Sequence, residues 1–316
     1  MALEAIERLR RNIGQVYIGR PETVDLLLVA VLAQGHLLLD DVPGIGKTTL
    51  LKSLARSLSL TFGRVQCTPD LLPTDITGLS YYDQEAGAFR FRPGPVLNHV
   101  VLVDEINRTT PRTQSALLEA MEERQVTVDG QTHPCADPFL VLATQNPIEL
   151  EGTFPLPEAQ LDRFLMRLHL GYPEEQDEAE IVRRHAVARP LADLQPVLTA
   201  AELMALRSQA AAVRVSEPVL AYMVALVRAT RTVEGIRLGA SPRADLALYR
   251  ASQALALLQD RAYVLPDDVK RLAEPVLAHR LILTGNARLR GETPELAVAQ
   301  LLERVPVPAE PLPEEG

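Results

Sequence analysis

A glycine-rich loop between an apolar run and a helical pattern is the feature that most constrains this fold. The apolar run, residues 36–40, lies between Gly35 and the loop, and we expect it to form a strand buried on both faces. Residues 47–58 are expected to form a helix. Glycines let backbone N–H groups approach an anion closely, and a helix N-terminus attracts negative charge. The order strand, loop, helix therefore predicts a phosphate-binding loop.

This loop also supplies the candidate ligands. We expect the Lys47 ammonium to reach the β- and γ-phosphates of a nucleotide and the Thr48 hydroxyl to bind Mg²⁺. The candidate nucleotide-binding residues are Val42, Pro43, Gly44, Ile45, Gly46, Lys47, Thr48 and Thr49. One position departs from the pattern G-x-x-x-x-G-K-[ST], because Asp41 stands where the pattern has glycine. A carboxylate there is unfavourable near phosphates unless its side chain points away.

Two carboxylates follow a second apolar run, residues 100–103, which we expect to be another buried strand. Asp104 is positioned to hold Mg²⁺, and Glu105 to orient or deprotonate an attacking water. The alternative is a turn with two solvated acids. The acid pair lies in an alternating pattern of strands and helices, which favours the catalytic interpretation.

A polar cluster, residues 143–146, ends the next apolar run. Ligands of parallel sheets collect at the carboxyl ends of the strands. We therefore expect Asn146 to contact the γ-phosphate or the attacking water. Without that context, the pair Asn146-Pro147 would indicate a turn.

The order of the patterns predicts the fold class. Strand patterns at 62–66, 100–103, 139–143 and 167–170 alternate with helical ones, which predicts an α/β fold with a mostly parallel sheet covered by helices. After about residue 172 only helical patterns follow. We expect a nucleotide-binding core at 1–172, a smaller all-α domain at 173–304 and a tail rich in Pro and Glu at 305–316.

Charge and cysteine content restrict the classes of function and the cellular compartment that fit this chain. The chain has 32 Lys and Arg against 41 Asp and Glu, a net charge of −9, which argues against broad binding of nucleic acid. Its two cysteines form no CxxC pair, so a reducing compartment fits. We expect a cytoplasmic protein without membrane insertion, because no secretion signal or long apolar run is visible. The six histidines lack metal-ligand spacing, and we expect ordinary surface or helix-end residues.

Taken together, the motifs resemble those of the AAA+ ATPases, and among them the MoxR family. The likeness covers about residues 10–285 and is highly specific in order and density. It rests on DVPGIGKT at 41–48, DEINRTTPRTQSALLEAMEE at 104–123, ATQNP at 143–147, EGTFPLPEAQLDRF at 151–164 and GASPR at 239–243.

This resemblance implies roles for the motifs: Walker A for the glycine-rich loop, Walker B for Asp104 and Glu105, and sensor 1 for Asn146. It implies that Arg163 is an arginine finger offered to a neighbouring subunit. It also implies that Arg243 is the sensor 2 arginine, which reaches the nucleotide from a helical lid. Without the family, both arginines would be ordinary surface residues.

By the same resemblance, residues 16–19 lie by the adenine, residues 72–95 form a helix-2 insert and residues 125–134 a pre-sensor hairpin. The hairpin pattern itself is visible in the sequence, which has an Asp-Gly turn at 129–130.

For function, the resemblance implies ATP and Mg²⁺ as cofactors and a homo-oligomer, namely a hexamer. It implies ATP hydrolysis that serves a protein client, in maturation or metal or cofactor insertion of protein complexes. A protein with a von Willebrand factor A domain is the implied partner. Two alternatives remain open: a nucleic-acid motor of the AAA+ class, and a nucleotide-gated assembly scaffold that does not hydrolyse. The acidic net charge argues against the nucleic-acid motor. The acid pair and Arg163 argue against a scaffold that does not hydrolyse.

Overall fold

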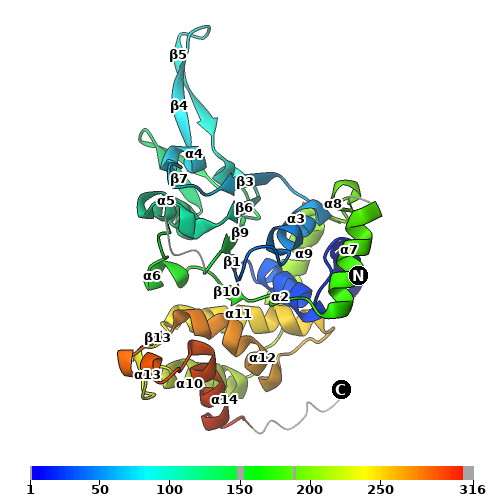
Figure 1. Cartoon of the computed structure of the whole chain (residues 1–316), viewed down its shortest axis with the longest axis vertical. Coiled ribbons are helices and arrows are strands. Elements are labelled where there is room, and N and C mark those ends of the chain that lie inside the picture. The colour runs from blue at the N-terminus through cyan, green and yellow to red at the C-terminus, as the bar shows by residue number, and fades with distance from the viewer. Residues whose placement is uncertain (1, 148–152, 188–189, 309–316) are drawn as a thin grey trace.

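The computed structural model describes residues 2–147, 153–187 and 190–308. Its centre is a five-stranded parallel sheet in the order β10–β1–β9–β6–β3 (Figure 1). These strands are β1 (Leu37–Asp40), β3 (Phe62–Gln66), β6 (Val100–Asp104), β9 (Leu140–Gln145) and β10 (Met166–Leu168). Parts of the expected 151–164 motif and 305–316 tail, at 151–152 and 309–316, lie outside the described residues.

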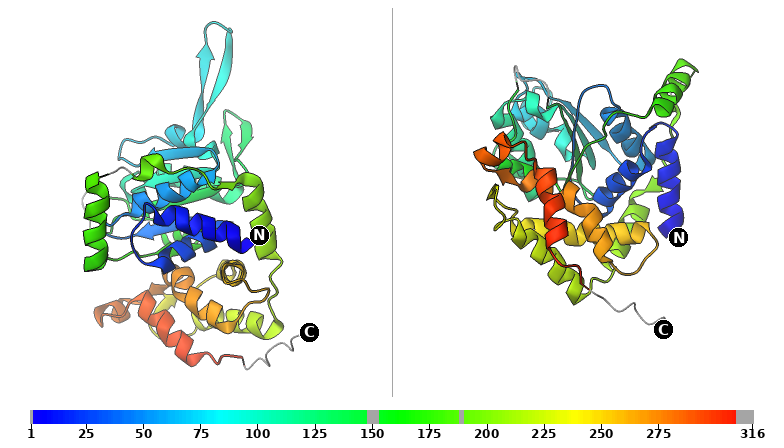
Figure 2. Two further views of the ribbon diagram at one scale, coloured as in Figure 1. Left: turned by 90° about the vertical axis from the view of Figure 1, so that its right-hand side faces the viewer. Right: turned by 60° about the horizontal axis from the view of Figure 1, so that its bottom comes forward.

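Helices cover both faces of the sheet, and β1 shows how. Successive side chains of a strand point to opposite faces. Leu37 and Leu39 therefore join the core that includes α1 (Ala2–Gly14), α2 (Pro21–Leu32) and α3 (Lys47–Ser57), whereas Leu38 joins the core under α5 (Pro111–Glu123). The two layers are visible in Figure 2. The predicted α/β class is confirmed.

Two hairpins extend the α5 side of the sheet. After α4 (Pro73–Thr77), β4 (Gly78–Asp83) and β5 (Ala88–Pro93) form an antiparallel hairpin that projects far from the body (Figures 1 and 2). Beside it, β7 (Gln125–Val128) and β8 (Gln131–Pro134) pair around Asp129 and Gly130, whose φ angles of 51° and 77° suit a two-residue hairpin turn. The rings of Phe91 and His133 stack at 3.8 Å and join the two hairpins.

The C-terminal part is mostly helical. Its helices are α7 (Glu175–Val187), α8 (Pro190–Asp193), α9 (Ala200–Ala211), α10 (Glu217–Ala229), α11 (Pro242–Leu258), α12 (Pro266–Leu277), α13 (Gly285–Leu289) and α14 (Pro294–Arg304). Helix α11 packs against α2, α9, α10 and α12, and so joins this part to the sheet domain. No helix in the described ranges is long and apolar enough to span a bilayer.

We expected only helices after residue 172, but the structure adds three short strands. They are β11 (Leu198–Thr199), β12 (Ile236–Leu238) and β13 (Ile282–Leu283). Strand β11 pairs with β2 (Leu58–Ser59) of the sheet domain, and β12 and β13 pair with each other. Strands of two or three residues are too short to produce a periodic pattern, which explains the difference.

Candidate active site

The glycine-rich loop, the acid pair and Asn146 meet at the carboxyl edge of the sheet. They follow β1, β6 and β9, which are neighbours, and they line one cavity of about 300 Å³. The lining residues are Pro43, Gly44, Gly46, Lys47, Thr48, Thr49, Arg64, Gln66, Asp104, Glu105, Thr144 and Asn146.

The loop has the conformation that its glycines permit. Gly44 and Gly46 have φ angles of 86° and 93°, which disfavour other residues, and α3 begins directly after them. The Lys47 ammonium donates to the backbone oxygens of Gln145, at 2.8 Å, and Asp41. Burial lowers the pKa of Lys47, and the carboxylates of Asp41 and Asp40 oppose that shift. The cation is therefore held between the ends of β1 and β9, beside the cavity.

The unusual Asp41 does not line this cavity. Its carboxylate accepts hydrogen bonds from the backbone N–H groups of Val42, at 2.8 Å, and Gly171, at 2.7 Å. Gly171 follows β10, so the side chain ties the loop to the neighbouring strand. The carboxylate is thus directed to backbone donors, which removes the conflict with a bound phosphate.

Thr48 and Asp104 form a pair of oxygen ligands. The Thr48 hydroxyl donates to Asp104 Oδ1 at 3.0 Å, and Asp104 is buried. The other carboxylate oxygen accepts from Arg64 Nε at 2.9 Å. Mg²⁺ prefers such hard oxygens and usually takes only one or two from the protein. The Thr48 hydroxyl and the Asp104 carboxylate are therefore suitable ligands for Mg²⁺. Sequence reasoning missed Arg64, because nothing distinguishes it from other exposed residues of β3.

Glu105 is held in an uncommon backbone conformation. Its φ and ψ are 57° and 54°, in the left-handed region that residues other than glycine rarely occupy. The Glu105 N–H donates to the Thr144 hydroxyl at 2.9 Å, and its carboxylate pairs with Arg108 at 3.0 Å. Thr144 lies on β9, so this bond joins the ends of two strands and directs Glu105 into the cavity.

Asn146 is locked to the same turn through its backbone. Asn107, two residues after Glu105, donates from its amide to the Asn146 oxygen at 2.8 Å. The Asn107 amide oxygen accepts from the Asn146 N–H at 3.3 Å. The ends of β6 and β9 are therefore fixed relative to one another.

A second cavity of about 460 Å³ adjoins the first and shares four loop residues with it. Its other walls are mostly apolar and are formed by Val16, Tyr17, Ile18, Ile45, Tyr172, Pro173, Glu178, Ile181 and Val182. A planar base fits such walls, and residues 16–18, for which the resemblance implied a place by the adenine, line this cavity.

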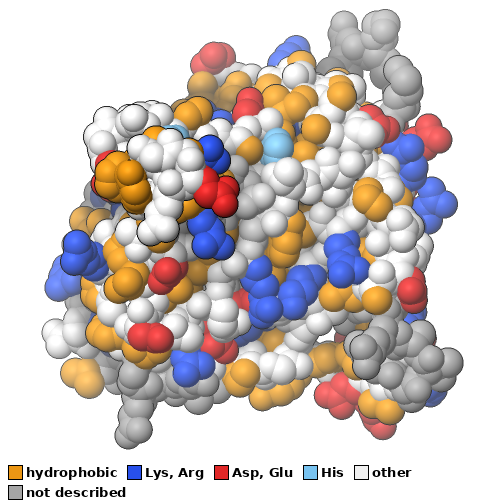
Figure 3. Space-filling model, turned by 90° about the horizontal axis from the view of Figure 1, so that it is seen from above, with side chains coloured by type: hydrophobic (Ala, Val, Ile, Leu, Met, Phe, Trp, Pro, Cys, Tyr) orange, Lys and Arg blue, Asp and Glu red, His pale blue; other side chains and the backbone are white. Residues whose placement is uncertain are grey.

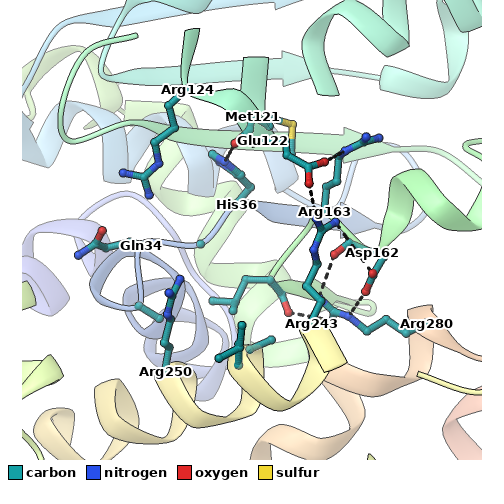
Figure 4. Close-up of a pocket in the computed structure, with 15 residues that line it drawn as sticks. Gln34, His36, Met121, Glu122, Arg124, Asp162, Arg163, Arg243, Arg250 and Arg280 are labelled. Carbon is teal, nitrogen blue, oxygen red and sulfur yellow. Dashed lines mark hydrogen bonds and ion pairs between the residues drawn. The ribbon is translucent and has the colours of Figure 1, made fainter. Parts of the chain in front are cut away.

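Arg163 and Arg243 lie elsewhere. They line a third cavity, of about 340 Å³, together with Gly35 and His36, which precede β1, whereas the glycine-rich loop follows β1 (Figure 4). Within one chain the structure therefore does not bring Arg243 to the nucleotide cavity. Both arginines instead bind Glu122: Arg163 Nε donates to one oxygen at 2.6 Å and Arg243 to the other. The bond from Arg163, with that from Arg243, lowers the pKa of Glu122.

Two histidines correct the expectation of surface residues, since His36 and His279 are both buried. His36 Nδ1 accepts from the Val141 N–H at 3.0 Å, and Nε2 lies 3.2 Å from the Met121 oxygen. Burial lowers the pKa of His36 to about 4, so its ring is neutral at pH 7. The ring ties the end of α5, just before Glu122, to β1 and β9.

A parallel sheet with a glycine-rich loop, an acid pair and a polar residue after three adjacent strands fits the AAA+ class of P-loop proteins. The family described as the ATPase family associated with various cellular activities (AAA) matches residues 36–166. The AAA lid domain family matches residues 228–301.

Proteins similar to this chain identify its family within the AAA+ class. A Bacillus subtilis protein, YeaC, is 47% identical over 95% of this chain and 93% of its own. Chaperone MoxR1 of Mycobacterium tuberculosis is 41% identical over 99% and 85%. A Cytophaga hutchinsonii protein described as an ATPase candidate, solved by crystallography, superposes with a TM-score of 0.91 at 39% identity, covering 98% and 96%. The chain belongs to the MoxR family of AAA+ ATPases.

Proposed function

We propose that this chain hydrolyses ATP with Mg²⁺ in a ring of identical copies and acts as a chaperone-like factor on a protein client. The observation that carries the proposal is the division of the site. Lys47, Thr48, Asp104 and Glu105 line one cavity, whereas Arg163 lies beyond the other end of β1.

The residues of the cavity have separate tasks in this reaction. Lys47 and the loop N–H groups bind the β- and γ-phosphates. Thr48 and Asp104 would hold Mg²⁺, which when bound would supply positive charge that offsets the negative charge of the phosphates. Glu105 accepts a proton from water, whose oxygen bonds to the γ-phosphorus while the bond to the β–γ bridging oxygen breaks. ADP and phosphate are the products. Asn146 contacts the γ-phosphate or the water.

The arginines favour an oligomer. Negative charge spreads over the γ-phosphoryl oxygens during transfer, and a guanidinium there stabilises the transition state. In one chain Arg163 and Arg243 are remote from that position, yet they line an open cavity beside Arg124 and Arg250 (Figure 4). We infer that this arginine cavity receives the triphosphate of a second copy. Family likeness favours a hexamer.

The client is inferred from relatives and from one exposed feature. MoxR1 is named a chaperone, which favours a protein client here, in maturation or metal or cofactor insertion. The projecting hairpin exposes Tyr82 and Phe89, at 54% and 75%, and aromatic residues are enriched in protein interfaces. The family resemblance points to a von Willebrand factor A domain protein as partner.

One observation favours a second candidate, a nucleic-acid motor. Along β5, Phe89, Arg90, Phe91 and Arg92 alternate aromatic and basic side chains, a pattern that suits single strands. However, Phe91 is stacked on His133, and Arg90 pairs with Asp83 at 3.0 Å. In the view down the hairpin, Lys and Arg groups are interspersed with acidic and uncharged ones (Figure 3).

Binding of single-stranded DNA at increasing salt separates these candidates. A motor predicts binding that weakens with salt and is lost in the double variant Phe89→Ala, Arg92→Ala. If the chain instead acts on a protein client, neither the wild type nor the double variant should bind single-stranded DNA.

Phosphate release tests the activity itself. We expect the purified chain to release phosphate from ATP, to stop when a chelator removes Mg²⁺, and to gain specific activity as its concentration rises. Binding of ATP without phosphate release, at a concentration where the chain is oligomeric, would instead support the scaffold. For the client, we expect co-purification with a Glu105→Gln variant and not with Lys47→Ala.

A further inference from the structure

Arg280 is a buried cation that the proposed chemistry does not use. It ends the short 3₁₀ helix η3 (Ala278–Arg280), directly after α12, and its side chain is only 2% exposed. Burial lowers its pKa to about 10, and Asp162 raises it, so the guanidinium stays charged at pH 7. A buried charge is costly unless it is paired and hydrogen-bonded.

Four hydrogen bonds of Arg280 go to the residues around Arg163. Arg280 Nη2 donates to the backbone oxygens of Asp162, at 3.2 Å, and Phe164, at 2.7 Å, which are the residues on either side of Arg163. Nη1 donates to the oxygen of Leu165 at 3.2 Å, and Nε to the Asp162 carboxylate at 2.7 Å. One side chain therefore holds the turn between α6 (Glu158–Leu161) and β10 at four points.

The same carboxylate also contacts the start of α11. The other Asp162 oxygen accepts from the Ser241 hydroxyl at 3.0 Å, and Arg243 Nη1 lies 4.0 Å from it. Ser241 is the N-cap of α11. Two C-terminal elements, η3 and α11, thus grip the Asp162–Leu165 turn from which Arg163 extends (Figure 4).

We propose that Arg280 is a positioning residue that sets Arg163 for the triphosphate of a second copy, so that movement of the C-terminal helices moves Arg163 with them. The inference rests on the proposed function, in which Arg163 acts across the interface. The planar fork of arginine is essential here, because lysine keeps the charge but cannot reach four acceptors in two directions.

The test compares Arg280→Lys with Arg207→Lys. Arg207 on α9 is also buried, with a pKa lowered to about 10 by burial, but its Nε donates to the Val31 oxygen on α2 and not to the Asp162–Leu165 turn. We expect Arg280→Lys to bind ATP like the wild type while its kcat falls by roughly 10- to 100-fold, because small misplacement of a catalytic group is that costly. Arg207→Lys should keep the wild-type kcat.

Mixing separates positioning from general damage. An Arg280→Lys subunit keeps an intact nucleotide cavity, so a Glu105→Gln neighbour with a well-placed Arg163 should restore its turnover. The gain should match that of Arg163→Ala mixed with Glu105→Gln. Normal turnover by Arg280→Lys alone overturns the inference, and so does an inactive Arg280→Lys that mixing does not rescue although it rescues Arg163→Ala.

Two further controls complete the design. If Arg280→Lys does not fold, Asp162→Asn replaces it, because it removes the charge that holds Arg280 Nε while keeping the size; the same rescue is expected, from a smaller loss. If Arg163→Ala itself is not rescued, the proposed action across the interface fails, and the inference fails with it.

Discussion

Thr48 and Asp104 are hydrogen-bonded at 3.0 Å although 56 residues separate them in the sequence. The bond joins the first turn of α3 to the end of β6, and it brings together two oxygens of the kind that Mg²⁺ prefers. The alternating α/β pattern explains the meeting, because the carboxyl ends of parallel strands share one edge.

Thr48→Val keeps the shape of the side chain and removes its oxygen, so we expect phosphate release to require a higher Mg²⁺ concentration. The measurement is a Mg²⁺ titration of turnover at saturating ATP. An unchanged half-saturating concentration would show that Thr48 is not a ligand.

Removal of the Lys47 ammonium should weaken ATP binding. A charge-assisted hydrogen bond contributes about 1.5–3 kcal/mol, so Lys47→Ala should bind ATP roughly 10- to 100-fold more weakly. Titration with a fluorescent ATP analogue measures this. The matched control is Lys52→Ala, from the same helix but outside the cavity-lining set, which should bind normally. Equal affinities of both variants would contradict the site.

Glu105→Gln should separate binding from turnover. The amide keeps the size but cannot accept the proton of the attacking water, so we expect kcat to fall by roughly 100-fold or more while ATP still binds. Steady-state phosphate release at saturating ATP measures kcat, and ATP titration measures binding. Glu123→Gln, an exposed residue at the end of α5, is the control. Wild-type turnover by Glu105→Gln would place the base elsewhere.

The buried His36 predicts an acid-sensitive fold. Its pKa falls from an ordinary 6.5 to about 4 on folding, so the unfolded chain binds more protons between these values. The stability is complete above pH 6.5 and declines as the pH falls toward 4. At pH 5 the loss from this one residue is about 2 kcal/mol.

Urea unfolding at pH 7.5 and pH 5 measures this loss. His36→Gln should show a smaller difference between the two pH values than the wild type, whereas His169→Gln, which changes an exposed residue, should show the full difference. Equal differences in all three proteins would mean that His36 does not titrate as its burial requires.

Local signals explain why much of the site was predictable. The glycine-rich loop, Asp104–Glu105 and Asn146 each follow an apolar run, and the parallel sheet brings these ends together. The contacts that orient them were not predictable in this way. Arg64 reaches Asp104 only through the pairing of β3 with β6, and Thr144 supports Glu105 across 39 residues.

The arginines show more clearly which contacts could not be predicted from the sequence. Glu122, Arg163 and Arg243 look like surface residues in the sequence, and only tertiary packing brings them to one cavity. The contact of Arg280 with Asp162 spans 118 residues and follows no periodic pattern. The burial of His36 and His279 was likewise missed, because it depends on packing between distant elements.

In the proposed function, Arg163 of one copy completes the nucleotide site of the next. A guanidinium in this role is worth about 10³–10⁵ in rate in other NTPases, so Arg163→Ala should bind ATP and hydrolyse it poorly. Exchange of subunits between variants is first established by pull-down of a tagged copy. Arg228→Ala, from α10, is the control arginine and should stay active.

The decisive measurement is phosphate release by a mixture of Arg163→Ala and Glu105→Gln chains, each inactive alone. The first variant keeps an intact cavity and the second supplies an intact Arg163, so a mixed interface contains every group that the reaction needs. We predict that the mixture regains a clear fraction of wild-type turnover. A mixture that exchanges subunits yet stays as inactive as its parts would show that Arg163 does not act on the nucleotide of a neighbouring copy.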